Sequence, residues 1–239
     1  MAHPDTIAPY LMKSVNRATR AFDLIRPGDR IAVGVSGGKD SRTLLDLLLR
    51  GVDLTPGEHA DRIHPADRVH PADRVRPGNK VCPYDVVAVH IDGSHIGLPD
   101  LRPTLQSWFE DLAVEYEFAP LEVPEGEPLP MDCFRCAWNR RKALFFAADR
   151  LGCNKVALGH HADDAAATTL LSLMYKGQLE TLDPNLSFFD GHFIVIRPLI
   201  YLSEPEIARY ARACGWQFPK ALQCPRKGKS RRVKIEQFL

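Results

Sequence analysis

The chain has 239 residues, of which 45% are hydrophobic and 26% are charged, and its formal net charge is +1. This length suffices for one domain with a substantial core, and the composition is ordinary for a globular protein. No apolar run reaches the length of a membrane span, and residues 1–20 lack the apolar core of a signal peptide, so we expect a cytoplasmic protein without a membrane partner.

Hydrophobic periodicity predicts helices and buried strands that alternate along most of the chain. Apolar residues recur at helical spacing in an N-terminal segment, a turn follows at 26–29, and the first β-branched run comes next. The expected helices cover 9–25, 41–50, 101–116, 133–152, 162–177 and 203–215, and the expected strands cover 30–35, 84–92, 117–123, 155–161 and 193–200. Such alternation is typical of a parallel sheet covered by helices on both faces.

Capping signals mark the ends of the last two expected helices. Gly177 closes the expected helix at 162–177. Ser203 and Glu206 have the spacing of a capping box, and Gly215 stands past the end of the same helix.

Residues 55–80 interrupt this pattern with a short tandem repeat. The sequence HPADRV occurs at 64–69 and again at 70–75. A repeat this short cannot build a packed solenoid, so we expect a mobile surface insertion. Its histidines leave metal binding open as an alternative; they are His59, His64 and His70.

Positive charge gathers in a C-terminal tail, 225–239. Most basic tails are simply solvated, but they can also bind phosphate groups, which makes nucleic acid a candidate partner. The tail contains one acid, Glu236. Its basic residues are Arg226, Lys227, Lys229, Arg231, Arg232 and Lys234.

Three polar segments follow three of the expected strands. They are SGGKDS at 36–41, HID at 90–92 and GHHADD at 159–164. Ligands of parallel α/β sheets bind at the carboxyl ends of the strands. We therefore expect the three segments to converge on one edge of the sheet.

The first segment is a glycine-rich loop with a lysine, but it is not a Walker A motif. Val33 stands where that motif requires its first glycine, and Asp40 stands where it requires a Ser or Thr. The spacing of the glycines also excludes the dinucleotide-binding motif. A phosphate cradle still makes sense chemically, because the paired glycines admit a pyrophosphate and the next helix offers free N–H groups. An acid in such a cradle implies a Mg²⁺ ion or a reacting group beside it.

This loop resembles the PP-loop of the ATP-pyrophosphatase superfamily, and GHHADD resembles a second motif of its tRNA-modifying branches. The resemblance implies a single PP-loop domain over 1–239, with the doubly wound parallel α/β sheet of the adenine nucleotide α-hydrolase-like, Rossmann-like type. It also implies cleavage of ATP at the α-phosphate with Mg²⁺ as cofactor. The residues it places at the nucleotide are Ser36, Gly37, Gly38, Lys39, Asp40, Ser41, His90, Gly159, His160, Asp163 and Asp164.

The cysteines narrow the chemistry further. In a cytoplasmic protein, the close pair Cys133 and Cys136 points to metal or redox work rather than to a disulfide. Three readings stay open, in order of preference: an iron–sulfur cluster, a persulfide pair and a zinc site, which would need a fourth ligand. The remaining cysteines in strand or helix contexts are expected in the core; they are Cys82, Cys153 and Cys214.

The cysteine pair, the Asn-Arg-Arg helix after it and a later lone cysteine resemble the tRNA 2-thiocytidine synthetase family. The resemblance runs from about residue 10 to 224, with 131–177 as its most specific part and the insertion as a departure. It implies a 4Fe-4S cluster on Cys133, Cys136 and Cys224, with one iron left open for sulfur.

The implied activity is ATP-dependent sulfur transfer to a tRNA base, with cytidine in the anticodon loop as the expected target. The base oxygen attacks the α-phosphorus and pyrophosphate leaves; sulfur then replaces the activated oxygen and AMP leaves. Lys39 and Asp40 join the three cysteines as catalytic residues, and Arg140 and Arg141 join the basic tail in holding tRNA. The sulfur comes from a donor protein or sulfide, and relatives favour a homodimer. A PP-loop iron–sulfur enzyme acting on a small thiolated base is the alternative, and a nucleotide-binding regulator is disfavoured.

Overall fold

The computed structural model describes residues 3–54, 83–217 and 235. The expected insertion at 55–80, and the tail at 225–239 except Ile235, lie outside the described residues. The helices are α1 (Pro4–Phe22), α2 (Lys39–Arg50), a short 3-10 turn η2 (Ser94–Ile96), α3 (Arg102–Asp111), α4 (Cys133–Arg150), α5 (Ala162–Lys176) and α6 (Glu204–Ala213). The strands are β1 (Arg30–Gly34), β2 (Asp85–Asp92), β3 (Glu115–Pro120), β4 (Lys155–Ala157), β5 (Asn185–Phe188) and β6 (Phe193–Ile196).

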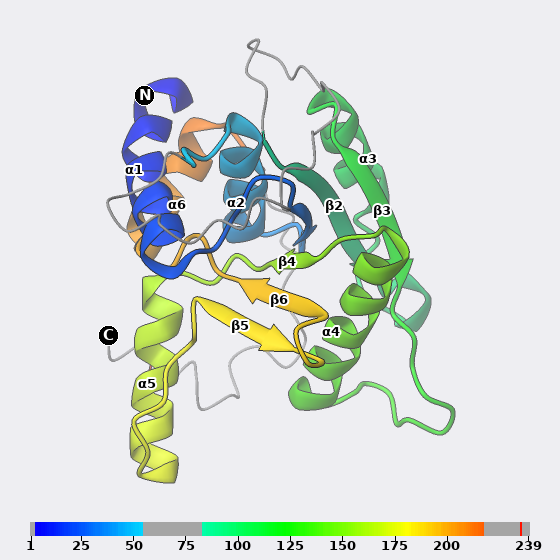
Figure 1. Ribbon diagram of the computed structural model, residues 1–239. Coiled ribbons are helices and arrows are strands. Elements are labelled where there is room, and N and C mark those ends of the chain that lie inside the picture. Colours follow the sequence, from blue (N-terminus) through cyan, green and yellow to red (C-terminus); the bar gives the residue numbers. More distant parts are fainter. Residues whose placement is uncertain (1–2, 55–82, 218–234, 236–239) are drawn as a thin grey trace.

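The strands form one sheet in the order β3-β2-β1-β4-β6-β5, drawn in Figure 1. All neighbours pair in parallel except β5, which runs antiparallel to β6 at the edge. The chain moves from β1 to β2 and β3 on one side and returns to β4 on the other. The order therefore reverses at β1, and in such sheets the ligand crevice lies at this switch point. The expected doubly wound α/β fold is confirmed.

Helices cover the two faces of the sheet unequally. One apolar core joins α1, α2, α3 and α6 to one face, and a smaller core joins α4 to the other. Helix α5 extends away from the sheet, at the lower left of Figure 1. Only Ala167 and Ser172 of this helix are buried. None of the helices in the described ranges is long and apolar enough to cross a membrane.

Several predicted boundaries are wrong, each for a local reason. Helix α1 begins five residues before the expected start, because the His3 side chain accepts a hydrogen bond from Asp5 N–H and Pro4 fits the first turn. It ends early at Asp23, whose φ of 51° is left-handed. Helix α3 stops at Asp111, and Ala113 turns the chain with a φ of 49°.

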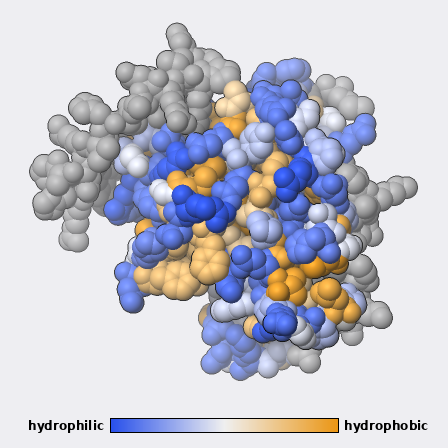
Figure 2. Space-filling model, turned by 90° about the vertical axis from the view of Figure 1, so that its right-hand side faces the viewer, coloured by the Kyte–Doolittle hydropathy of each residue, from blue (hydrophilic) through white to orange (hydrophobic). Residues whose placement is uncertain are grey.

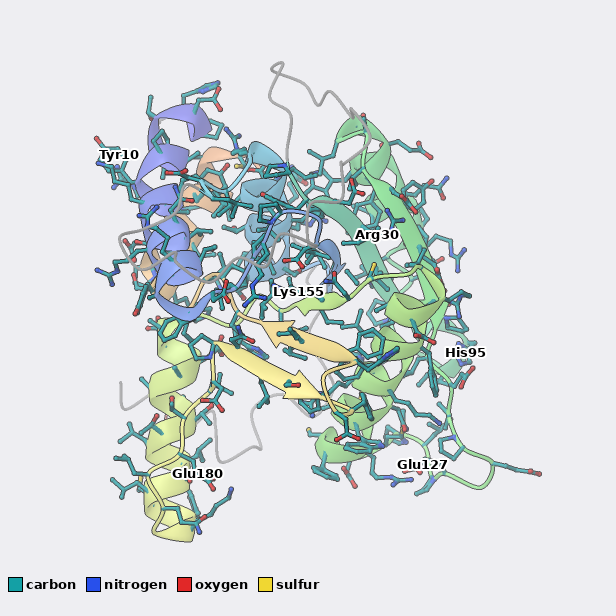
Figure 3. The ribbon with its side chains drawn as sticks, in the orientation of Figure 1. Tyr10, Arg30, His95, Glu127, Lys155 and Glu180 are labelled. Carbon is teal, nitrogen blue, oxygen red and sulfur yellow. The ribbon has the colours of Figure 1, made fainter. Side chains whose placement is uncertain are left out.

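The amino edge of the sheet is closed by a buried ion pair. The Lys155 Nζ atom lies 2.8 Å from Asp29 Oδ2 and donates to the Leu24 carbonyl at 2.7 Å, and its side chain is only 3% exposed. Figure 3 shows Lys155 beside Arg30, near the starts of β4 and β1. This pair ties β4 to the chain ahead of β1 and lies at the amino edge, whereas the polar motifs follow the carboxyl ends of the strands.

Candidate active site

The glycine-rich loop after β1 is ordered by its own hydroxyl groups. The Ser36 N–H donates to Ser41 Oγ at 3.2 Å, the two hydroxyl oxygens are 3.2 Å apart, and Ser41 Oγ donates to the Gly38 carbonyl at 3.2 Å. Gly37 has a φ of +83°, which a side chain would strain. Gly38 is the N-cap of α2 and has no side chain to accept from the first-turn N–H groups. These groups and the helix dipole can therefore bind a phosphate.

Lys39 lies between two carboxylates at the start of α2. Its Nζ atom is 3.1 Å from Asp40 Oδ1 and 3.0 Å from Glu204 Oε1, the first residue of α6. Burial works against the charged ammonium, but the two carboxylates outweigh it and raise the pKa of Lys39. The lysine therefore carries a full positive charge for an incoming phosphate group.

The second motif meets the loop at Asp40. A Cβ atom on Gly159 would lie 3.0 Å from the backbone carbon of Asp40 and 3.0 Å from the nitrogen of Ser41, so only glycine fits without displacement. The Nε2 atom of His161 is 3.8 Å from Asp40 Oδ1. That buried oxygen pairs with the Lys39 ammonium at 3.1 Å and has no other polar partner at hydrogen-bond distance within the described part of the chain.

The two histidines of the second motif face different neighbours. His161 is 6% exposed and contacts Asp40, although the predicted nucleotide-binding set omits it. His160, which that set includes, accepts a hydrogen bond from Arg197 Nε at 3.3 Å. No pattern in the sequence shows which of the two adjacent histidines contacts the nucleotide loop.

The acids of the second motif hold helix starts. Asp164 Oδ2 accepts from the His161 N–H at 2.9 Å, which closes a capping box on α5. Asp163 Oδ2 accepts from the Glu204 N–H at 2.8 Å and so ties α5 to α6. These bonds fix the starts of α5 and α6, where His161 and Glu204 lie near Asp40 and Lys39 of the nucleotide loop.

His90 joins the third segment to the loop. Its Nδ1 atom lies 2.7 Å from the carbonyl oxygen of Val35, the residue before Ser36. Burial lowers the pKa of His90, which favours the neutral imidazole. The expected convergence of the three polar segments on one edge of the sheet is thus confirmed by direct contacts.

The cysteine pair lies in the first turn of α4. The N-cap Asp132 accepts from the Arg135 N–H at 2.8 Å. Cys133 is exposed and Cys136 is half-buried, and both are free thiols. Helical periodicity puts both thiols on the same side of α4 as Ala143, Leu144 and Ala147, which are buried in the core. Because α4 starts at the carboxyl edge, the thiols lie on its sheet-facing side at that edge.

The other predicted ligands and basic residues lie in different parts of the fold. Cys153 is buried and burial raises its pKa to about 11, as expected of a core cysteine. Arg140 shares the sheet-facing side of α4 with the thiols, and Arg141 lines a cavity. The residues outside the described ranges are Cys82, Cys224, Arg226, Lys227, Lys229, Arg231 and Arg232.

Cys133 and Cys136 are the candidate ligands for a metal centre in the described ranges. In residues 3–54 and 83–217, no group of three or more His, Cys, Asp or Glu side chains has the geometry to hold a metal ion. Two free, accessible thiols on one helical face suit a soft metal such as cluster iron, and they supply two ligands. The pair therefore fits a cluster that takes its remaining protein ligand from elsewhere in the chain.

Curated relatives of this chain include tRNA-cytidine(32) 2-sulfurtransferases. The chain is 34% identical over 237 residues to the tRNA-cytidine(32) 2-sulfurtransferase of Anaeromyxobacter dehalogenans, covering 96% of this chain and 71% of the relative. It is 36% identical over 217 residues to the enzyme of that name from Acidovorax ebreus, covering 87% of this chain and 58% of the relative. No family model matches the sequence.

Solved structures share the fold. The U34-tRNA thiolase NcsA from Methanococcus maripaludis, with its [4Fe-4S] cluster, superposes with a TM-score of 0.66 at 19% identity, over 97% of this chain and 72% of that one. The phosphoadenylyl-sulfate reductase of Candida auris superposes with a TM-score of 0.51 at 13% identity, over 92% of this chain and 89% of that one. On the sequence similarity to the curated enzymes, the chain belongs to the tRNA-cytidine(32) 2-sulfurtransferase family.

Proposed function

We propose that this protein is an ATP-dependent sulfur transferase that replaces the oxygen of a tRNA cytidine with sulfur. One observation carries the proposal: Asp40 of the glycine-rich loop meets Gly159 and His161 at the edge of the sheet where α4 begins with Cys133 and Cys136. The relatives are named for sulfur transfer to cytidine in tRNA, which supports this substrate over a small thiolated base.

The loop residues would bind ATP through its phosphates. The first-turn N–H groups of α2 and the hydroxyl of Ser36 can donate to a pyrophosphate, and Lys39 can turn from Glu204 to a phosphate oxygen. Asp40 would hold Mg²⁺ through its carboxylate, whose Oδ1 atom pairs with the Lys39 ammonium at 3.1 Å until that lysine turns to a phosphate. Together these groups would neutralise charge that develops at the α-phosphorus as pyrophosphate leaves.

The thiols would hold the sulfur-handling centre. Cys133 and Cys136, with Cys224 as the third ligand, would hold a 4Fe-4S cluster, which supplies an iron position for sulfur when bound. The Asp132 cap fixes the first turn of α4 and so sets the direction of both thiols. We also propose that Arg140 and the basic tail bind tRNA phosphates, that the sulfur comes from a donor protein or sulfide, and that the protein acts in the cytoplasm as a homodimer.

The proposal predicts an oxygen-sensitive brown protein. After anaerobic purification, iron and acid-labile sulfide should be present in near-equal amounts, with a visible absorption band. Cys133→Ala, Cys136→Ala and Cys224→Ala should each lose at least half of the iron, because each removes one thiolate ligand. Cys214→Ala is the matched control, since this half-buried thiol lies in another helix end, and it should keep its iron. A colourless wild type that contains zinc would contradict the cluster.

A further inference from the structure

A cavity of about 120 Å³ lies between α4 and the strands β4, β6 and β5. Its walls are largely apolar and include Phe145 and Phe188, whose ring centroids are 5.5 Å apart. Two guanidinium groups, those of Arg141 and Arg197, also line it. Arg197 directly follows the last residue of β6, so the cavity extends to the carboxyl edge of the sheet. The nucleotide loop and the thiols use none of these residues.

The cavity carries an excess of positive charge. Arg197 is 7% exposed, and it donates to His160 Nδ1 at 3.3 Å and to the Asp183 carbonyl. Burial first, and the charge of Arg141 second, lower the pKa of Arg197, and the charge of the Asp183 carboxylate offsets only part of this. Within the described chain neither guanidinium forms an ion pair with a carboxylate. Arg197 is buried and Arg141 is exposed, so an anion at the mouth of the cavity could bond to both, and charge-assisted bonds to guanidinium are strong.

The size and lining of the cavity match a single aromatic ring. A protein cavity of roughly 150 Å³ holds one benzene ring. The cavity of about 120 Å³ is of this order, so a six-membered pyrimidine is the largest base that it could take and a fused purine is too large. Phenyl rings stack on unpaired bases, and proteins that act on RNA bases draw them out of the stack into such pockets.

We propose that this cavity receives the target nucleotide of the RNA substrate, with the pyrimidine beside Phe145 and Phe188 and a phosphate on Arg141 and Arg197. The inference rests on the proposed function and deepens it. The bond from Arg197 to His160 links the cavity to the second motif, which contacts the nucleotide loop through Gly159 and His161. The cavity on the α4 face of the sheet is thus connected to the nucleotide loop at the carboxyl edge, and an acceptor base held in the cavity can approach the activated phosphate there.

Binding of cytidine 5′-monophosphate tests the cavity without any turnover. Titration calorimetry on the full chain should show saturable binding of this probe, with cytidine, inorganic phosphate and adenosine 5′-monophosphate each bound more weakly. Arg141→Ala should weaken binding of the probe about tenfold, the loss expected for a charge-assisted hydrogen bond. Lys142→Ala removes the same charge from the next position of α4, where the side chain lies by the ring of Phe146, and should bind the probe normally.

Three results would overturn the assignment. They are equal binding of inorganic phosphate, which would mark an adventitious ion only; competitive displacement of the probe by ATP, which would place the cavity in the ATP site; and normal binding by Arg141→Ala. In the thiolation assay, Arg141→Ala should raise the KM for tRNA about tenfold while the KM for ATP stays unchanged. A wild type that binds the probe but never thiolates tRNA would count against the proposed function, whereas active enzyme with no probe binding would count against the cavity alone.

Discussion

Gly159 sets how closely the second motif approaches the nucleotide loop. Its missing side chain leaves room for the backbone of Asp40 and Ser41, which would lie 3.0 Å from an added Cβ atom. Backbone atoms at the start of a helix cannot rotate away as a flexible side chain can. Substitution must therefore shift the loop or the motif, and both carry the predicted phosphate contacts.

Gly159→Ala should weaken ATP binding at least tenfold and lower the free energy of unfolding by about 1–3 kcal/mol, the usual cost of an overpacked site. Equilibrium binding and urea denaturation measure the two quantities. Gly191→Ala is the control, since its φ of +92° strains any side chain while its Cβ atom meets only Ser187 Oγ at 4.0 Å. It should lose stability without loss of ATP affinity. Normal ATP binding by Gly159→Ala would show that the close approach is unimportant.

His90 makes the stability of the loop depend on pH. Burial lowers its pKa below the ordinary value of 6.5, so the folded protein binds this proton less readily than the unfolded chain does. The stability it contributes is complete above pH 6.5 and is lost as the pH falls from there toward the lowered value. His90→Asn should flatten this part of the profile, measured by urea denaturation at a series of pH values. An unchanged slope in the variant would mean that another group causes it.

The sequence does not show which histidine of the GHHADD motif contacts Asp40. The glycine loop and the GHHADD motif could be recognised from residue types and their place after strands. Their adjacent histidines could not be assigned, because neighbours in extended backbone point in opposite directions. His161 is extended, with φ of −126° and ψ of −175°, and so it faces Asp40 while His160 faces Arg197.

At the scale of elements, the start of α6 reaches into the nucleotide site. The Ser203 and Glu206 capping box, predicted from their spacing, is present, with the Ser203 N–H donating to Glu206 Oε2 at 2.8 Å. The cap orients the first turn, and Glu204 within it lies 3.0 Å from Lys39 Nζ. An incoming phosphate must therefore compete with this carboxylate for the lysine.

Glu204→Gln should tighten ATP binding by up to about fivefold, because a half-exposed ion pair contributes at most about 1 kcal/mol. The side chain of Glu204 is 56% exposed, which justifies this limit. Glu180→Gln is the control, since its carboxylate pairs with Lys176 at 2.8 Å and is 53% exposed. Its ATP affinity should equal that of the wild type. Weaker ATP binding by Glu204→Gln would show that the carboxylate assists the nucleotide rather than competing with it.

Two of the elements that the sequence misplaced or missed, β3 and β5, depend on pairing across the sheet. The apolar pattern of 101–116 continues into β3, so the helix could be read too far, and only the register of β3 on β2 separates them. Strand β5 has four residues and, in the described ranges, pairs with β6 alone, so no long pattern marks it. Helices α4 and α5 were predicted nearly to their ends, because strong caps and periodicity act locally.

At the scale of the whole molecule, one edge of the sheet gathers the polar motifs and the thiols. Among the described helices, α4 is the one that packs on this face of the sheet, and Figure 2 shows this side of the molecule with apolar patches among charged side chains. Three of the large exposed apolar side chains belong to α4: Phe134, Trp138 and Phe146. In Figure 3, Glu127 marks the loop that leads into α4, and His95 follows β2 on the same side. We expect a long RNA ligand to approach the edge across this face.

The central claim is sulfur transfer driven by cleavage of ATP at its α-phosphate. The most direct test incubates the anaerobic protein with ATP, Mg²⁺, sulfide and tRNA, digests the tRNA and measures its nucleosides by mass spectrometry alongside the nucleotide products. The account predicts thiolated cytidine, with AMP and pyrophosphate formed in equal amount and none of the three formed by Asp40→Ala. Formation of ADP and phosphate, or of AMP without any thiolated nucleoside under these conditions, would contradict it.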